Sequence, residues 1–585
     1  MDTIVDILLK KFHRAIVDVY PQLSEETALE IVQSTQEKFG HYQCNSTMKL
    51  TKLLGQPPRA IAEKLVAAID KNDDQGRAVI ASLSIAGPGF INITLDHHFL
   101  SRHVNHMLGD PHLGIELPAT PQRIVIDFSS PNTAKEMHVG HLRSTIIGDC
   151  LARLFEFLGH DVLRLNHIGD WGTAFGMLIT YMKQQAPQVL SGEQETNLTH
   201  LVAWYKASKQ HFDNDPKFKK DSQLEVVALQ SGNQEALKSW QIICDISRKA
   251  YQEIYDLLDI DLIERGESFY NPMLADTVAD LEAKGLITLS NGAKCIFIEG
   301  FQNRDGDPLP LMLQKSDGGY NYDTTDMAAI RQRITDEKAD RIIYVTDAGQ
   351  GQHFEMIFKA AEMAGYLDPK KVKVDHVPFG MVLGSDGKKF RTRSGDTERL
   401  IDLIDTAIKE ADNILKERAI EISAEERKQL AKTLGINAIK YADLSCNRIS
   451  DYTFSYERML RFEGNTAAFL MYAFVRVAGI KRKIQASINL LLLNHSIHLE
   501  HPSEIALGLH LAQFGETLKS VDSYLLPNQL TEYLYLLAEK FNAFFRDCRV
   551  EGSLEQNPRL LLCEVTARVM KQGMEILGLH TIDRM

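Results

Sequence analysis

Two histidines three positions apart stand at the start of a predicted helix. They belong to the segment SSPNTAKEMHVGHLRST, residues 129–145, which follows a short apolar strand pattern and opens an amphipathic helical one. His138 and His141 can face one pocket at the helix N-terminus, where unpaired N–H groups and the helix dipole favour anions. Gly140 between them leaves room for a nucleotide to approach the backbone. The pattern points to phosphate binding, with a metal pair or incidental capping histidines as alternatives.

A second segment concentrates positive charge beside a turn-forming stretch. Four basic residues closely follow the glycine-containing run at 384–387: Lys388, Lys389, Arg391 and Arg393. A cationic loop of this kind suits the phosphates of a nucleotide or a leaving pyrophosphate, because developing negative charge must be met by positioned donors. The alternative is a solvated run of surface charge.

A tyrosine and an aspartate four residues apart could recognise a cation. Tyr322 and Asp326 lie on one face if their segment is helical, so an aromatic ring and a carboxylate can converge there. A guanidinium presents fixed donors that a carboxylate accepts as a fork. The alternative is a plain helix start in which residues 323–326 cap and fill the first turn.

These segments lie within a pattern typical of a parallel sheet. Apolar strand-like runs begin at residues 123, 161, 341 and 372 and alternate with helical patterns. This predicts an α/β fold with a doubly wound, parallel-sheet (Rossmann-like) domain over residues 116–400. A polar stretch with helical period, at about 177–270, is expected to be an insertion in that domain.

Regions of different pattern flank the predicted sheet. Residues 1–115 combine helical patterns with a strand-like alternation and are expected to form an N-terminal α+β domain. From Leu400 onward strand signals largely vanish. We therefore expect a helical connecting region at 401–455 and an all-α helical C-terminal domain at 456–585.

Composition limits the class of protein. The chain has 585 residues and a net charge of −13, which excludes a small stapled scaffold and argues at first sight against a nucleic-acid partner. Locally, however, residues 464–499 contain no acidic residue and carry Arg476 and Lys481 among interleaved aromatic residues. This stretch predicts an RNA contact, with a core helix that has a solvated basic edge as the alternative.

The cysteines and the apolar runs indicate where in the cell the protein is located. Seven scattered cysteines form no CxxC pair, so we expect buried free thiols in a reducing compartment and neither zinc nor another metal held by the protein. The N-terminal helical pattern is interrupted by charges, and no apolar run is long enough to span a bilayer. We predict a cytoplasmic protein without a membrane partner.

Several motifs together resemble a known family. His138 to His141, HVGH, resembles the HIGH signature of class I aminoacyl-tRNA synthetases, and the run from residue 129 to 149 resembles the arginyl-tRNA synthetase form of it. Further stretches follow in the order of the arginyl family: HIGDWGTAFG, YNYDTTDMA, VTDAGQGQH, MVLGSDGKKFRTRSGDT, FEGNTAAFLMYAFVRV and the ending MEILGLHTIDRM. The resemblance covers most of residues 40–585.

The resemblance implies an activity and a set of substrates. It implies ATP-dependent ligation of L-arginine to its cognate tRNA, tRNA(Arg), through an arginyl-adenylate, with Mg²⁺ bound through the ATP phosphates. It also implies a monomer that needs tRNA to activate arginine, with residues 1–115 touching the tRNA elbow and residues 456–585 reading the anticodon. Residues 388–393 would occupy the place of the KMSKS loop, although Thr392 stands where that signature has its second lysine.

The same resemblance implies residue roles. ATP would be bound by His138, Gly140, His141 and Lys389, with Lys388, Arg391 and Arg393 as further catalytic candidates. Arginine would be held by Asp127, Ser129, Asn132, Tyr322, Asp326 and Gln350. The tRNA would be contacted by Asn45, Arg476 and Lys481. Asp127 is one methylene shorter than the glutamate frequent at its position.

Two other functions are compatible with parts of this pattern. One is a HIGH-type nucleotidyltransferase that adenylates a small acid without RNA, although such an enzyme needs no separate C-terminal helical domain. The other is a catalytically inactive, synthetase-like RNA-binding paralogue, against which the intact histidines and cationic loop argue.

Overall fold

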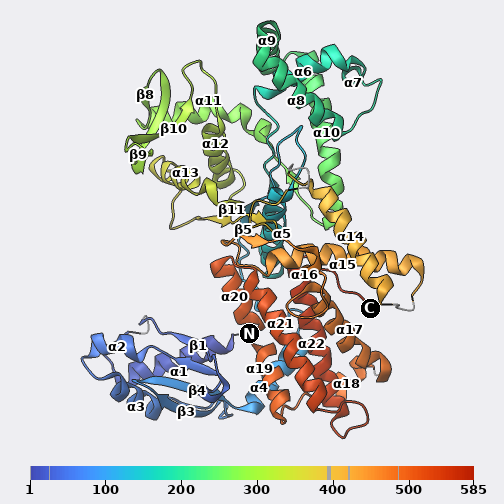
Figure 1. Cartoon of the computed structure of the whole chain (residues 1–585). Helices are drawn as coiled ribbons and strands as arrows, with labels where there is room; N and C mark the ends of the chain where they lie inside the picture. The colour runs from blue at the N-terminus through green and yellow to red at the C-terminus, as the bar shows by residue number, and fades with distance from the viewer. Residues whose placement is uncertain (1, 25–26, 392–396, 419–421, 485–486) are drawn as a thin grey trace. The chain divides into compact units, whose positions relative to one another are not determined.

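The computed structural model describes residues 2–24, 27–391, 397–418, 422–484 and 487–585. Figure 1 labels the helices and strands along the chain. Contacts divide the chain into two compact units. The central unit comprises Pro118–Arg461 and Ile576–Leu579, and the terminal unit comprises Met1–Leu117, Phe462–Glu575 and His580–Met585. The sequence predicted four regions with boundaries at residues 115, 400 and 455. This division into two units does not test those boundaries, which remain predictions. Within the described residues, no helix has both the length and the apolar character needed to cross a membrane.

The central unit is built on a five-stranded sheet whose neighbouring strands are all parallel. Its strand order is β12-β11-β5-β6-β7. The strands are β5 (Arg123–Asp127), β6 (Asp161–Asn166), β7 (Ile263–Glu264), β11 (Arg341–Asp347) and β12 (Lys373–Phe379). Because β5 lies in the middle, its apolar residues are fully buried. The predicted parallel-sheet α/β fold is confirmed.

Helix α5 (Val139–Phe157) follows β5 and connects it to β6. Its apolar residues recur at helical spacing and are buried. Gly159, with a φ of 84°, follows the helix as the sequence pattern predicted. The connection therefore delivers the N-terminus of α5 to the edge of the sheet where β5 ends.

Five helices lie where the helical insertion was expected. They are α6 (Ala174–Gln185), α7 (Pro187–Ser191), α8 (Leu198–Asn214), α9 (Pro216–Gln230) and α10 (Gln234–Leu258). The long helix α10 carries the chain back toward β7. Tyr251 and Tyr255, near its C-terminal end, are buried against the loop that follows β5.

A three-stranded antiparallel sheet lies between the strands of the parallel sheet in sequence, and the sequence patterns did not predict it. It consists of β8 (Thr288–Ser290), β9 (Ala293–Gln302) and β10 (Pro308–Gln314), in the order β10-β9-β8. Pro308 and Pro310 interrupt the strand signal, because proline is unfavourable inside a sheet, and the pairing of β10 with β9 shifts register at this point.

The remaining elements of the central unit follow β7 in the chain. The helices are α11 (Glu267–Ala283), α12 (Tyr322–Thr335), the short η2 (Ala348–Gln350), α13 (Gly351–Met363), α14 (Leu400–Glu417), α15 (Ala424–Leu444) and α16 (Tyr456–Met459). Two short strands, β13 (Val382–Leu383) and β14 (Tyr452–Thr453), pair in parallel. This pair ties the start of the cationic loop to the segment that follows α15.

The terminal unit joins an α+β part to a helical part. The first has an antiparallel sheet in the order β1-β2-β4-β3, formed by β1 (Ile31–Gln33), β2 (Tyr42–Cys44), β3 (Ile80–Ala86) and β4 (Phe90–Leu95). Its helices are α1 (Ile4–Val19), η1 (Glu37–Phe39), α2 (Thr47–Leu54), α3 (Pro58–Ala68) and α4 (His97–Gly109). The helical part contains α17 (Ala467–Ile484), α18 (Ile488–Asn494), α19 (Pro502–Ala512), α20 (Phe514–Tyr524), α21 (Asn528–Asp547) and α22 (Gln556–Ile576). The predicted α+β class of the N-terminal part and the predicted all-α class of the C-terminal part are confirmed.

Residues 577–579, which directly follow α22, are part of the central unit. Lys440 of α15 is buried and donates from Nζ to the carbonyl of Gly578 at 2.8 Å and to that of Leu258. Burial lowers the pKa of Lys440 to about 8, against the attraction of nearby Asp149. The segment 576–579 therefore satisfies a buried cation next to α5.

We expect Gly578→Ala to lower the melting temperature of the protein. Gly578 has a φ of 74°, and a Cβ there would lie 2.9 Å from Oδ2 of the buried Asp149 and 3.3 Å from Nζ of Lys440. Backbone strain together with this crowding costs roughly 1–3 kcal/mol. The control is Gly232→Ala, which has a φ of 81° and no atom within 4 Å of a Cβ. Equal losses for the two variants in a circular-dichroism melt would contradict the role of the 576–579 segment.

Candidate active site

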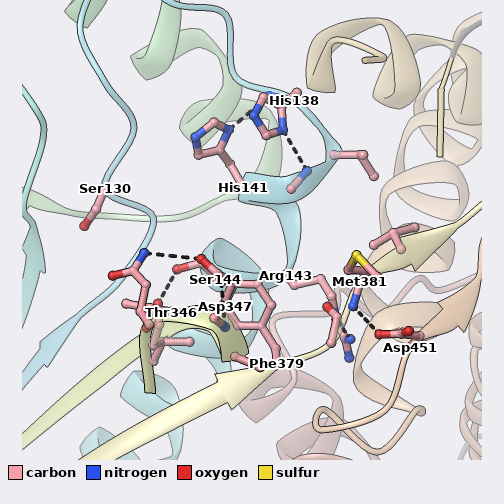
Figure 2. A pocket seen from close by; sticks show the side chains of 18 of the residues that line it. Ser130, His138, His141, Arg143, Ser144, Thr346, Asp347, Phe379, Met381 and Asp451 are labelled. Atoms are coloured by element: carbon pink, nitrogen blue, oxygen red, sulfur yellow. Dashed lines mark hydrogen bonds between the residues drawn. The ribbon is translucent and has the colours of Figure 1, made fainter. Parts of the chain in front are cut away.

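A cavity of about 760 Å³ lies at the carboxyl ends of β5, β11 and β12, beside the N-terminus of α5 (Figure 2). Ligands of open parallel sheets bind at this edge. Seven predicted site residues line it: Ser129, Asn132, His138, Gly140, His141, Gln350 and Lys389. Asp127, Tyr322, Asp326, Lys388 and Arg391 do not line it, and Arg393 lies outside the described residues.

The two histidines form the cap of α5. The N–H of Gly140 donates to Nδ1 of His138 at 3.0 Å, and the N–H of His138 donates to Nδ1 of His141 at 3.1 Å. Their ring centroids are 4.2 Å apart. A neutral imidazole that accepts at Nδ1 carries its proton on Nε2, so both rings keep an N–H donor.

The surroundings keep both rings neutral. Burial, with the nearby cations Lys389 and Lys135, lowers the pKa of His138. Burial and the neighbouring His138 lower the pKa of His141 to about 3. The pair therefore offers two uncharged donors at the positive end of the helix dipole, which is an arrangement suited to anionic oxygens.

The absence of a side chain at Gly140 serves the first histidine. A Cβ on Gly140 would lie 2.7 Å from Cε1 and 2.9 Å from Nδ1 of His138. Any other residue would therefore displace the imidazole from its capping position. The sequence suggested that Gly140 leaves room for a nucleotide. In the structure, the group closest to the missing side chain is the His138 ring.

The loop between β5 and α5 has an unusual backbone. Ser129, Ser130 and Ala134 have φ values of 73°, 50° and 61°, in the left-handed region that residues with a Cβ rarely adopt. Each such residue costs on the order of 1 kcal/mol or more and persists only where the surroundings determine it. Hydrogen bonds from neighbouring elements hold this loop in its conformation.

Helix α10 holds the loop from the side of the insertion. The hydroxyl of Tyr255 is 2.7 Å from Oγ of Ser129, and that of Tyr251 donates to the carbonyl of Asn132 at 2.5 Å. Ser247 accepts from the N–H of Ala134 at 3.0 Å. The loop conformation thus depends on helix α10, which lies more than 110 residues further along the chain.

Asn132 projects from this loop into the cavity. It is exposed there, and no described residue is a hydrogen-bond partner of its side chain. Gly169 packs directly against it, because a Cβ on Gly169 would lie 2.1 Å from Oδ1 of Asn132. Backbone bonds from Thr133 and Gly169 hold the two segments together at 3.0 Å.

The cationic loop begins as a tight turn after β13. The N–H of Gly384 donates to the carbonyl of Lys388 at 2.8 Å, and Lys389 bridges to Leu383. Neighbouring residues of an extended segment point to opposite sides. Lys389 accordingly lines the cavity, and the exposed Lys388 does not.

Residues on the far side of the cavity were not predicted from the sequence. Oδ1 of Asp347 accepts from the N–H of Gly349 at 2.8 Å, and Oδ1 of Asp451 accepts from the N–H of Met381 at 2.6 Å (Figure 2). Buried Arg143 donates to the carbonyls of Gly380 and Ser450. Asp347 lies in a motif already identified, whereas no signal placed residues 449–451 beside the cavity.

Asp127 is engaged inside the sheet. Its Oδ2 lies 2.9 Å from Nη1 of the buried Arg333, and its Oδ1 accepts from Oγ of Ser130 at 3.1 Å. The carboxylate therefore faces a residue of α12 on one side and the strained loop on the other.

Tyr322 and Asp326 begin α12, so their predicted helical spacing is correct. Both contact His353 of α13: the rings of Tyr322 and His353 are 5.2 Å apart, and Oδ2 of Asp326 is 2.6 Å from Nε2 of His353. The histidine lies in the same motif as the cavity residue Gln350, three residues further along α13.

The candidate RNA contacts lie in the terminal unit. The Arg476 guanidinium lies 5.5 Å from the ring centroid of Tyr472 and 5.7 Å from that of Phe545, and both rings are more than 40% exposed. Lys481 falls in α17, and its side chain lies outside the described residues. Asn45 is half-buried, with a buried Oδ1 that lacks a hydrogen-bond partner.

No protein cage for a metal is present in the described part of the chain, where no three His, Cys, Asp or Glu side chains are grouped to hold an ion. The cysteines there are all free.

Comparisons with known proteins identify the family. Residues 103–456 match the model of the class I tRNA synthetase (R) catalytic domain, 470–585 the DALR anticodon binding domain, and 6–95 the arginyl tRNA synthetase N-terminal domain. An arginine–tRNA ligase of Protochlamydia amoebophila is 64% identical, and one of Chlamydia abortus 52%, each over 100% of both chains. The Plasmodium falciparum arginyl-tRNA synthetase structure matches with a TM-score of 0.86 and 34% identity over 100% of both chains. The Thermus thermophilus enzyme, at 21% identity and a TM-score of 0.80, covers 99% of this chain and 100% of its own and shares the fold.

We expect His141 to stay uncharged across the pH range in which the protein is folded. Its pKa of about 3 in the folded state lies below the 6.5 of a free imidazole. The unfolded chain then binds more protons between these values, so this group makes stability fall as pH drops from 6.5 toward 3. Histidine NMR should show no titration of the His141 ring above pH 5. A midpoint near 6.5 for this ring would contradict the burial argument.

Proposed function

Because the chain belongs to the class I arginyl-tRNA synthetases and is an arginine–tRNA ligase, we propose an assignment of its substrates to the residues described above. The ligase joins L-arginine to tRNA(Arg) with ATP. The observation that carries the assignment is the histidine pair, whose two Nε2–H donors lie at the N-terminus of α5 inside the cavity.

ATP would bind with its phosphates at this helix end. His138 and His141 would donate to phosphate oxygens, Gly140 would leave the His138 ring in place, and Lys389 would approach from the cationic loop. Mg²⁺ would enter with the phosphates, since it prefers phosphate oxygens and water to an all-protein cage. Lys388, Arg391 and Arg393 remain candidates for the leaving pyrophosphate.

The first step would form arginyl-adenylate. The arginine carboxylate attacks the α-phosphorus, the bond to the β-phosphate oxygen breaks, and pyrophosphate leaves. Negative charge then gathers on the phosphoryl oxygens, where donors that are already in position stabilise it without rearrangement. The lowered pKa values of His138 and His141 keep both rings in the form that donates only from Nε2.

Arginine would extend from the cavity toward α12. Ser129, Asn132 and Gln350 would hold its amino and carboxylate groups, and Tyr322 with Asp326 would receive the guanidinium. Asp127 would act through the strained loop, because its carboxylate is already bonded to Arg333 and Ser130.

The terminal unit would bind the tRNA. Tyr472, Arg476 and Phe545 form an exposed stack of ring, guanidinium and ring that suits an unpaired base. Lys481 would add a phosphate contact, Asn45 a contact from the α+β part to the tRNA elbow, and the C-terminal helices would read the anticodon. We further propose a monomer located in the cytoplasm.

Pyrophosphate exchange tests this function. We expect exchange to require arginine and to occur only when tRNA(Arg) is present. Full exchange without tRNA would favour an RNA-independent nucleotidyltransferase, and no exchange under either condition would favour an inactive paralogue.

Gly169→Ala should weaken arginine binding through Asn132. The new Cβ would displace the Asn132 amide, which is free to rotate, and each hydrogen bond lost to a charged group costs about 1.5–3 kcal/mol. We expect the KM for arginine to rise roughly tenfold to a hundredfold and the KM for ATP to stay near normal. Asn132→Ala should give the same increase, and the double variant no more than either alone. Additive effects would show that Gly169→Ala acts elsewhere.

Arg476→Ala and Phe545→Ala should each raise the KM for tRNA(Arg). Stacking of a base on an aromatic ring is worth about 1–3 kcal/mol, which corresponds to roughly tenfold or more. Aminoacylation at varied tRNA concentration measures the effect, with Tyr524→Ala, an exposed tyrosine on α20, as control. Unchanged KM in both variants would remove the stack from the tRNA-binding surface.

A further inference from the structure

We propose that His353, as a cation, is a positioning residue that sets the geometry and charge of the guanidinium pocket. The inference rests on the proposed placement of arginine at Tyr322 and Asp326. Nothing in the family match assigns His353 a role, and it does not line the main cavity. Its position between two carboxylates of α12 carries the argument.

Both ring nitrogens of His353 face carboxylate oxygens. Nε2 lies 2.6 Å from Oδ2 of Asp326, and Nδ1 lies 3.3 Å from Oδ1 of Asp323. A neutral imidazole has one N–H and could face only one of these acceptors with a donor, whereas the protonated ring has an N–H on each side, bonded to Asp326 and ion-paired with Asp323. The geometry therefore selects the charged form.

The two carboxylates keep the ring charged although it is buried. The side chains of His353, Asp323 and Asp326 are each less than 20% exposed. Burial alone would lower the pKa of His353, but the hydrogen bonds to Asp323 and Asp326 outweigh it and raise that pKa to about 9. The ring is thus a fixed cation at neutral pH.

The contacts leave one acceptor for a substrate. Asp323 is fully engaged, because its Oδ1 faces His353 and its Oδ2 accepts from the N–H of Met312 at 2.9 Å. Oδ2 of Asp326 is held by His353, and no described residue donates to its Oδ1. By holding one oxygen, His353 fixes the direction in which the other points.

The charges of the pocket then match a single cation. Two aspartates and one imidazolium leave a net charge of about −1, which one guanidinium neutralises. Glu267 of α11 carries only part of a negative charge at neutral pH, since burial, followed by Asp170 and Asp326, raises its pKa to about 7. Without the His353 charge, Asp323 and Asp326 would repel each other and Asp326 could rotate.

The titratable groups around this ring come from α12, β12, α11 and β9. Tyr322, Asp323, Asp326 and His376 interact with the ring itself, whereas Glu267 of α11 is coupled to Asp326 and Cys295 of β9 to Asp323. Burial lowers the pKa of His376 to about 4, so this second histidine adds no charge at neutral pH. His353 is consequently the group among them that supplies positive charge.

The test compares two substitutions at His353. His353→Phe removes both donors and the charge, and it should raise the KM for arginine roughly tenfold to a hundredfold, with the KM for ATP changed less than about twofold. His353→Gln keeps one N–H near Nε2 but not the charge and should have a smaller effect, about threefold to tenfold. The matched control is His200→Gln, at an exposed histidine of α8.

The pH profile separates positioning from a general packing role. In the wild-type enzyme the ring loses its proton as pH rises through about 9, so the KM for arginine should approach that of His353→Gln there. The α-amino group of arginine titrates in a nearby range, and therefore the ratio of the two KM values is the measure. A ratio that stays constant between pH 7 and 10 would overturn the charge role.

Asp326→Asn keeps the two hypotheses apart. If it raises the KM for arginine and His353→Phe does not, the pocket assignment stands and the role of His353 is refuted. If Asp326→Asn leaves that KM unchanged, the proposed arginine site itself is wrong. If His353→Phe raises the KM values for arginine and ATP equally, the residue supports the fold and the inference fails.

Discussion

The candidate active site depends on one strained loop between β5 and α5. Ser129, Ser130 and Ala134 adopt left-handed conformations that cost free energy, and the chain turns sharply enough to bring Asn132 and the cap of α5 to one cavity. Tyr255, Ser247 and Ser144 compensate with hydrogen bonds at 2.7–3.0 Å. Because two of these partners lie on α10, the inserted helices are part of the site's support.

The enzyme uses histidine in two opposite ways. Near the proposed phosphates, burial and neighbouring cations lower the pKa of His138, so the ring donates without carrying charge. Near the proposed guanidinium, two carboxylates raise the pKa of His353, so the ring is a cation among acids. A charged His138 would be repelled by Lys389 and Lys135, and a neutral His353 would leave Asp323 and Asp326 in repulsion. The environment, more than the residue type, decides the chemistry.

Sequence predicted the elements that have strong local signals. The four main strands, helix α5 and the histidine pair follow from periodicity and from a motif at a helix start. The antiparallel sheet was missed because prolines weaken the pattern of β10. His353 and Asp451 were missed for another reason: each acts through a partner distant in the chain, Asp326 or Met381, and no local pattern reports such a contact.

The net charge of −13 takes on a different meaning at the level of residues. Acidic groups gather where a cationic amino acid should bind, as in Asp323, Asp326 and Glu267, while Lys389 lines the phosphate side of the cavity. Interactions between exposed charges fade over about 8–10 Å in physiological salt, so the local arrangement governs each substrate. An acidic protein can therefore bind ATP and RNA, because the total charge does not describe the field in any one site.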